Sequence, residues 1–102
     1  MPEFGTAFSG LACDRKLTHT ELVRAIRFMV AAEYEAVQVY MQLAESVDNK
    51  LARAVLQDIA DEERVHAGEF LRLLKELAPD EKEFYEKGAA EVEEIITAQG
   101  RR

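Results

Sequence analysis

Two residues with metal-binding side chains lie one helical turn apart within an otherwise apolar stripe. Glu63 and His66 supply a carboxylate and an imidazole at positions i and i+3, which share one side of a helix. The other members of this stripe recur in alternating steps of three and four residues: Leu56, Ile59, Phe70, Leu73 and Leu77. The spacing predicts an amphipathic helix whose apolar face is interrupted by ligands suited to a transition metal.

A second stripe, further upstream, carries one more carboxylate. Glu33 interrupts apolar and aromatic residues that again follow steps of three and four: Leu22, Ile26, Met29, Ala36, Tyr40, Leu43 and Val47. Ionised carboxylates are rarely buried unless they are paired or bind a metal. We therefore expect Glu33, Glu63 and His66 to share a cation.

Helices must position these residues, since the chain has the composition of a helical protein. It is 48% hydrophobic and 32% charged, with no Trp, and Ala, Glu, Leu, Lys and Arg dominate it. The patterns predict an all-α fold with helices over residues 17–46, 50–77 and 79–98. The connection at 47–49 is short enough to join antiparallel neighbours.

The ends of these helices carry recognisable signals. Thr18 or Thr20 is expected to cap the first helix, and Asp48 or Asn49 the second. Pro79 is expected at the first position of the third, shorter helix, which has a weaker apolar stripe of Tyr85, Ala89, Val92 and Ile96. We predict a flexible N-terminal segment at 1–16, a helical domain at 17–98 and a tail at 99–102.

The connection sets the register of the two long helices. Glu33 lies fifteen residues before Asp48, and Glu63 lies fifteen residues after it. At about 1.5 Å per residue, both are roughly 22 Å from the turn. A closed hairpin therefore places Glu33 opposite Glu63, with His66 one turn further along.

One chain supplies half of the ligand set of a dinuclear carboxylate site. Such sites in helical bundles use four carboxylates and two imidazoles, and two copies of Glu33, Glu63 and His66 make up that number. A homodimer related by a two-fold axis would also cover the apolar stripes, giving a four-helix bundle. We expect two iron ions per dimer, with zinc, manganese or calcium as possible substitutes, and assembly that is linked to metal binding.

Charge and composition exclude some other classes of function. The net charge of −7 argues against a nucleic-acid partner, which calls for a basic face. No apolar run approaches the roughly 20 residues of a membrane span. A single cysteine, Cys13, cannot form a disulfide within the chain, which favours a cytoplasmic protein.

Two motifs resemble those of the encapsulated ferritins, half-length members of the ferritin-like superfamily. They are Glu33-Tyr34-Glu35-Ala36-Val37-Gln38-Val39-Tyr40 and Asp61-Glu62-Glu63-Arg64-Val65-His66. The resemblance covers residues 17–88. It implies a ferroxidase that oxidises Fe(II) to Fe(III) with dioxygen for iron storage and detoxification, in a ring-shaped decamer inside an encapsulin compartment.

The resemblance also implies roles for individual residues. Glu33, Glu63 and His66 match the ferroxidase ligands, Tyr40 matches a tyrosine near the site, and Glu35 matches a carboxylate on the metal access path. Two other functions fit the same residues. One is a rubrerythrin-like peroxidase, and the other is a non-catalytic helical oligomer that binds a structural metal.

Overall fold

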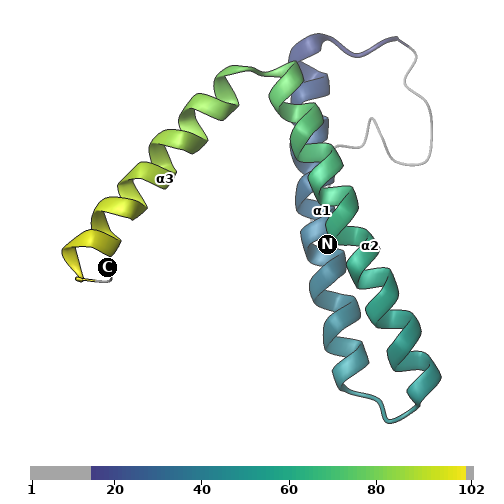
Figure 1. Cartoon of the computed structure of the whole chain (residues 1–102). Coiled ribbons are helices and arrows are strands. Elements are labelled where there is room, and N and C mark those ends of the chain that lie inside the picture. Colours follow the sequence, from purple (N-terminus) through teal and green to yellow (C-terminus); the bar gives the residue numbers. More distant parts are fainter. Residues whose placement is uncertain (1–14, 101–102) are drawn as a thin grey trace.

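Three α-helices make up the part of the chain that the structure, a computed structural model, describes (residues 15–100). They are α1 (His19–Glu45), α2 (Lys50–Leu77) and α3 (Asp80–Ala98). Figure 1 shows α1 and α2 side by side as an antiparallel hairpin, with α3 leaving its open end. The predicted hairpin and shorter third helix are confirmed, while residues 1–14, with Cys13, and the tail residues 101–102 lie outside the described part.

The first helix begins at the predicted cap. The Thr18 hydroxyl accepts a hydrogen bond from the Glu21 backbone N–H at 3.2 Å, and the Glu21 carboxylate accepts one from the Thr18 N–H at 2.8 Å. This reciprocal pair is a capping box. Arg15 donates two hydrogen bonds to Glu21, both of 2.7 Å, and together these contacts lower the pKa of Glu21 to about 2.

The two remaining helices begin close to the predicted positions. Asn49 caps α2, because its side-chain oxygen accepts from the Ala52 N–H at 2.9 Å. Pro79 is the residue before α3 rather than its first residue, a difference of one position that is common at helix ends. Acidic residues fill the first turn of α3, where the helix dipole favours negative charge.

The residues that are buried between α1 and α2 of one chain are mostly not those of the two stripes. The buried residues of the hairpin recur mostly in steps of seven, and we call them the hairpin seam: Val23, Ile26, Val30, Val37, Ala44, Ala60, Ala67 and Leu74. Of the two predicted stripes, Ile26 alone belongs to this seam. The other residues of the stripes, which we expect a second copy to cover, lie beside this seam in a single chain.

Small side chains explain why the seam runs where it does. Ala60 and Ala67 are 0% and 5% exposed, so the backbones of the two helices approach closely along this line. Larger residues such as Phe70 and Leu77 pack at the edge of the buried cluster. On α2 the seam thus has alanine at two of its three positions, and several large apolar side chains lie at the sides of the hairpin.

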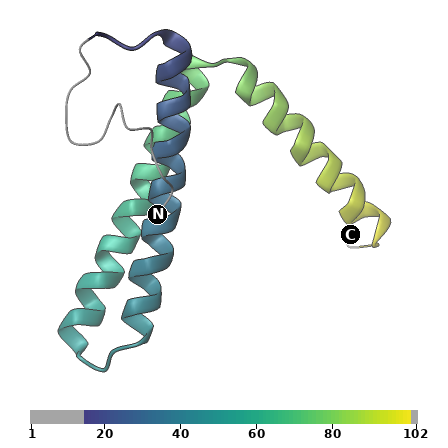
Figure 2. The same cartoon turned by 180° about the vertical axis from the view of Figure 1, so that it is seen from behind.

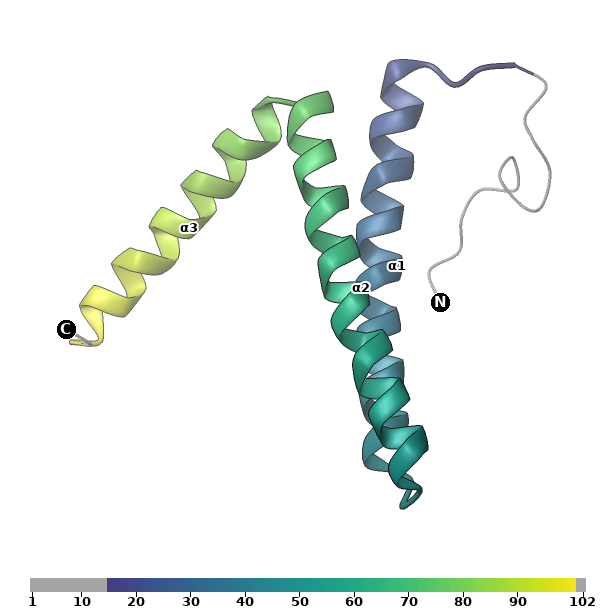
Figure 3. The ribbon, with the colours of Figure 1, turned by 45° about the vertical axis from the view of Figure 1, so that its right-hand side comes forward.

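The third helix stands apart from the hairpin. Viewed from behind, α1 and α2 overlap near the open end of the hairpin and are seen side by side towards the turn, whereas α3 diverges from them (Figure 2). Figure 3 shows the same divergence from another side, with α2 and α3 forming a V. None of the residues of α3 is buried. Across residues 15–100, no helix combines the length and the apolar character that crossing a membrane requires.

Candidate metal centre

The hairpin brings Glu33, Glu63 and His66 together, and we call these three residues the ligand cluster. One ligand atom from each lies within 4.8 Å of the others. His66 Nδ1 is 3.6 Å from Glu33 Oε2 and 3.5 Å from Glu63 Oε2. Both distances exceed those of hydrogen bonds, so the three side chains converge without bonding to one another.

The spacing of the ligand cluster fits a transition metal. Bonds from an imidazole nitrogen or a carboxylate oxygen to such an ion are about 2.0–2.2 Å long, which puts two ligand atoms on one ion about 3.0–3.4 Å apart. The observed 3.5 and 3.6 Å between His66 and the two carboxylates are close to that range. Small side-chain adjustments would bring all three groups onto one cation.

One oxygen of the cluster lacks a partner that its burial requires. Glu33 Oε2 is buried, and no donor in the described part of the chain hydrogen-bonds to it. An unsatisfied buried acceptor costs about 1–3 kcal/mol, and more when it is charged. A bound cation would remove this cost, so the observation favours a metal over a purely structural role for Glu33.

The ligand cluster lies at the surface of a single chain. The side chains of Glu33 and Glu63 are 19% and 18% exposed, whereas that of His66 is 47% exposed. Around it lie the residues of the two predicted stripes, which we call the site face and which are half-buried or exposed: Leu22, Met29, Ala36, Tyr40, Leu43, Leu56, Ile59, Phe70 and Leu73. An apolar surface with carboxylates at its centre is thus left uncovered in one chain.

The structure does not add the two remaining predicted site residues to the ligand cluster. Tyr40 is half-buried on the site face, about 10 Å along α1 from Glu33. Glu35 lies roughly 200° around α1 from Glu33, since each residue turns the helix by about 100°. Their roles near the site and on the access path stay predictions.

One cluster of polar side chains could not be predicted from a pattern in the sequence. Arg27 of α1 donates a hydrogen bond to Glu81 of α3, and the Tyr85 hydroxyl donates to the other oxygen of that carboxylate. The hydrogen bond from Arg27, followed by that from Tyr85, lowers the pKa of Glu81. Glu81 in turn raises the pKa of Tyr85. We call these three residues the clamp, because they tie the start of α3 to α1.

Comparisons with known proteins support the family resemblance of the two motifs. The sequence profile of the rubrerythrin family matches residues 22–99. The chain is 42% identical over 84 residues to the encapsulin nanocompartment cargo protein EncC of Myxococcus xanthus, which covers 82% of this chain. It is 35% identical over 82 residues, or 80% of its length, to a ferritin-like–encapsulin shell fusion protein of Pyrococcus furiosus.

The chain matches only part of these two relatives but nearly all of one solved structure. It spans 64% of the cargo protein and 24% of the fusion protein. The crystal structure of the encapsulated ferritin domain from Pyrococcus furiosus superposes with a TM-score of 0.78 at 32% identity, covering 90% of this chain and 92% of that one. The chain therefore belongs to the rubrerythrin family, as a ferritin-like helical domain of the type named encapsulated ferritin.

Proposed function

We propose that two copies of the chain pair through their site faces around a two-fold axis. Each copy contributes one ligand cluster, so the pair has four carboxylates and two imidazoles, which is the set used by dinuclear sites in helical bundles. The uncovered apolar residues of the site face would then form the core of a four-helix bundle. Covering the face and completing the ligand set thus require the same contact.

The reaction that this centre supports best is the oxidation of Fe(II) to Fe(III) by dioxygen. Carboxylate and imidazole ligands suit iron and manganese, and zinc or calcium can compete for such groups. Two Fe(II) ions held together supply two electrons, one each, which together with two protons reduce dioxygen to hydrogen peroxide. The observation that carries the proposal is the convergence of Glu33, Glu63 and His66 around a buried, unpartnered oxygen.

The side chains of the cluster divide the work of holding the two iron ions. In the proposed pair, Glu33 and His66 of each copy would hold one iron ion, and Glu63 of each copy would supply a further carboxylate that helps to neutralise the charge of the ions. Tyr40 lines the apolar surroundings of the centre, and Glu35 supplies a carboxylate on the route of incoming iron. The apolar site face excludes water from the paired centre and so strengthens its electrostatic interactions.

We infer the cellular setting from the relatives. One of them is named as an encapsulin cargo protein, and another is fused to an encapsulin shell. We propose that this chain likewise works inside an encapsulin compartment in the cytoplasm, where the Fe(III) product is stored, and that its dimers assemble into a ring of ten chains.

Iron titration tests the proposed function. Fe(II) is added without oxygen to the wild type and to Glu33→Ala, Glu63→Ala and His66→Ala, and air is then admitted while oxygen uptake is recorded. We expect about one iron per chain in the wild type and loss of rapid oxidation in each variant. Glu62→Ala is the matched control, because Glu62 is an exposed neighbour outside the cluster. Wild-type iron binding by all three cluster variants would refute the site.

A peroxidase is the second candidate, because the matching family profile is that of rubrerythrin. The same iron-loaded protein can be oxidised by dioxygen or by hydrogen peroxide, and the two rates compared. A ferroxidase should react rapidly with dioxygen alone. Fast oxidation by peroxide together with slow oxidation by dioxygen would favour the peroxidase.

A further inference from the structure

The ligand cluster combines residues of two helices. Glu63 and His66 both belong to α2, so the 3.5 Å between their ligand atoms follows from the i,i+3 spacing of one helix. Glu33 belongs to α1, and its Oε2 atom lies 3.6 Å from His66 Nδ1 across the hairpin. This second distance therefore depends on the separation of the two helices at the level of the cluster.

The hairpin seam passes the ligand cluster at the same offset on both helices. On each helix, one buried seam residue lies three positions before the ligating glutamate and another lies four positions after it: Val30 and Val37 on α1, Ala60 and Ala67 on α2. These offsets keep the seam residues within about 60° of Glu33 or Glu63 around the helix. Each glutamate therefore has a buried contact one turn to either side of it.

The antiparallel register pairs these seam residues across the hairpin. Counted from Asp48, Val37 lies eleven residues before and Ala60 twelve residues after, so the two are at nearly the same level. Val30 and Ala67 form the next pair, eighteen residues before and nineteen residues after Asp48. At both levels that border the ligand cluster, a larger side chain of α1 thus meets an alanine of α2.

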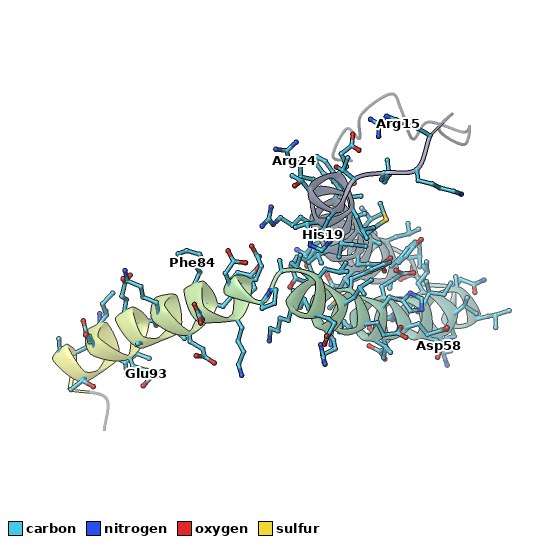
Figure 4. The ribbon with its side chains drawn as sticks, turned by 90° about the horizontal axis from the view of Figure 1, so that it is seen from above. Arg15, His19, Arg24, Asp58, Phe84 and Glu93 are labelled. Carbon is cyan, nitrogen blue, oxygen red and sulfur yellow. The ribbon has the colours of Figure 1, made fainter. Side chains whose placement is uncertain are left out.

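Ala60 faces α1. Viewed from above, Asp58 projects on the side of α2 that faces away from α1 (Figure 4). Ala60 lies two residues further on, about 200° around the helix, and it is 0% exposed. The distance between the axes of two packed helices is about 8–10 Å and depends on the side chains at the contact. Alanine at this position therefore favours a short separation of α1 and α2.

We propose that Ala60 and Ala67 are positioning residues for the metal centre, because their small side chains hold α1 close enough for Glu33 to share an ion with His66. The inference rests on the ligand cluster of the proposed function and names what sets its spacing. Two ligand atoms on one transition-metal ion lie about 3.0–3.4 Å apart. Widening the hairpin by about 1 Å would carry Glu33 Oε2, now 3.6 Å from His66 Nδ1, well beyond that spacing.

The open end of the hairpin provides an internal comparison. The next seam pair, Val23 and Leu74, has a large side chain on both helices, and the two residues belong to one buried cluster. This pair lies ten or eleven residues from the ligating glutamates, or about 15 Å along the helices. Alanine thus occurs in the seam of α2 at the two levels beside the ligand cluster, and leucine occurs where no ligand has to reach across.

Zinc binding tests the proposal, because Zn(II) uses the same types of ligand and has no redox chemistry. Isothermal titration calorimetry of the full chain gives the dissociation constant for Zn(II) in the wild type and in Ala60→Val. We expect Ala60→Val to raise this constant by about 10- to 100-fold, as is typical when groups that hold a ligand in place are changed. Ala54→Val makes the same change at an exposed position of α2 and should change the constant by less than about threefold.

Three further variants separate the spacing of the helices from the stability of the fold. Exchanging the pair, with Val37→Ala and Ala60→Val in one chain, keeps the summed side-chain volume and should restore zinc binding. Leu74→Ala destabilises the fold away from the cluster and should leave zinc binding unaltered. Ala60→Ser adds a single atom, so it is expected to fold even where Ala60→Val does not, and it should bind zinc more weakly than the wild type.

The outcomes distinguish this inference from the proposed function. Equal zinc affinity in the wild type and the Ala60 variants, equal losses in Ala60→Val and Leu74→Ala, or a wild type that binds no zinc would overturn the positioning role. The expected losses, with recovery in the exchanged pair, would support it. A wild type that shows this pattern but does not oxidise Fe(II) with dioxygen would refute the proposed reaction and leave the positioning role intact.

Discussion

Replacing Glu33 by Gln should make the metal-free protein more stable while removing its iron site. The wild-type chain buries Glu33 Oε2 without a hydrogen-bond partner, 3.6 Å from His66 Nδ1. An unsatisfied buried acceptor costs about 1–3 kcal/mol. Because Gln has no charge and carries two donors, we expect Glu33→Gln to recover about 1 kcal/mol, which raises the melting temperature of a domain of this size by about 4–8 °C.

Metal should reverse this order of stability. A ligand at 100 times its dissociation constant stabilises the folded state by about 2.7 kcal/mol, and we expect the wild type alone to gain this because Glu33→Gln lacks a ligand. Thermal unfolding followed by circular dichroism, with chelator and then with anaerobic Fe(II), measures both halves of the prediction. The melting temperatures of the two proteins should cross between these conditions.

Glu62→Gln removes the same charge from an exposed position one residue away from the cluster, and it should change neither melting temperature by more than a degree or so, as is usual for surface changes. A metal-free Glu33→Gln protein that melts below the wild type would show that Glu33 stabilises the apo fold. The unpartnered Glu33 oxygen would then not destabilise the metal-free protein.

Two further outcomes follow from the fold. Leu74 is 2% exposed in the hairpin seam, so Leu74→Ala should lower the free energy of unfolding by about 2–5 kcal/mol. A lower urea midpoint is expected. A decrease below about 1 kcal/mol would contradict the burial of Leu74 in the seam. Arg15 lowers the pKa of Glu21 from 4.5 to about 2, so the stability that this carboxylate contributes is present above pH 4.5 and lost as the pH falls towards 2. In Glu21→Gln the glutamine can still complete the capping box, so this variant loses only the charge. The urea midpoints of the wild type and the variant should therefore become equal as the pH falls over that range. A difference between the midpoints that stays constant would count against the ion pair.

Much of the ligand cluster could be predicted from the sequence because local geometry determines it. The rise per residue of an α-helix and the short connection at 47–49 place Glu33 opposite Glu63, and the i,i+3 spacing places His66 beside them. The caps at Thr18 and Asn49 act over three residues. Each of these features depends on neighbours in the chain or on one tight turn.

The hairpin seam and the direction of α3 could not be predicted from neighbouring residues in this way. Stripes in steps of three and four occur on two adjacent sides of α1, and which side is buried depends on the small residues Ala60 and Ala67 of the opposite helix. The spacing of seven from Val23 to Val30 to Val37 was the available signal. No pattern predicts that Arg27 meets Glu81 across 54 positions, because that contact depends on how the chain leaves α2.

Native mass spectrometry of the anaerobic Fe(II)-loaded protein tests the central claim most directly, because it counts chains and metal ions in the same particle. The account predicts species with even numbers of chains and one iron per chain, so that two chains hold two ions, and it predicts loss of the iron in Glu63→Ala. Iron carried by single chains at the wild-type ratio, or wild-type dimers without iron, would contradict a centre shared between two copies.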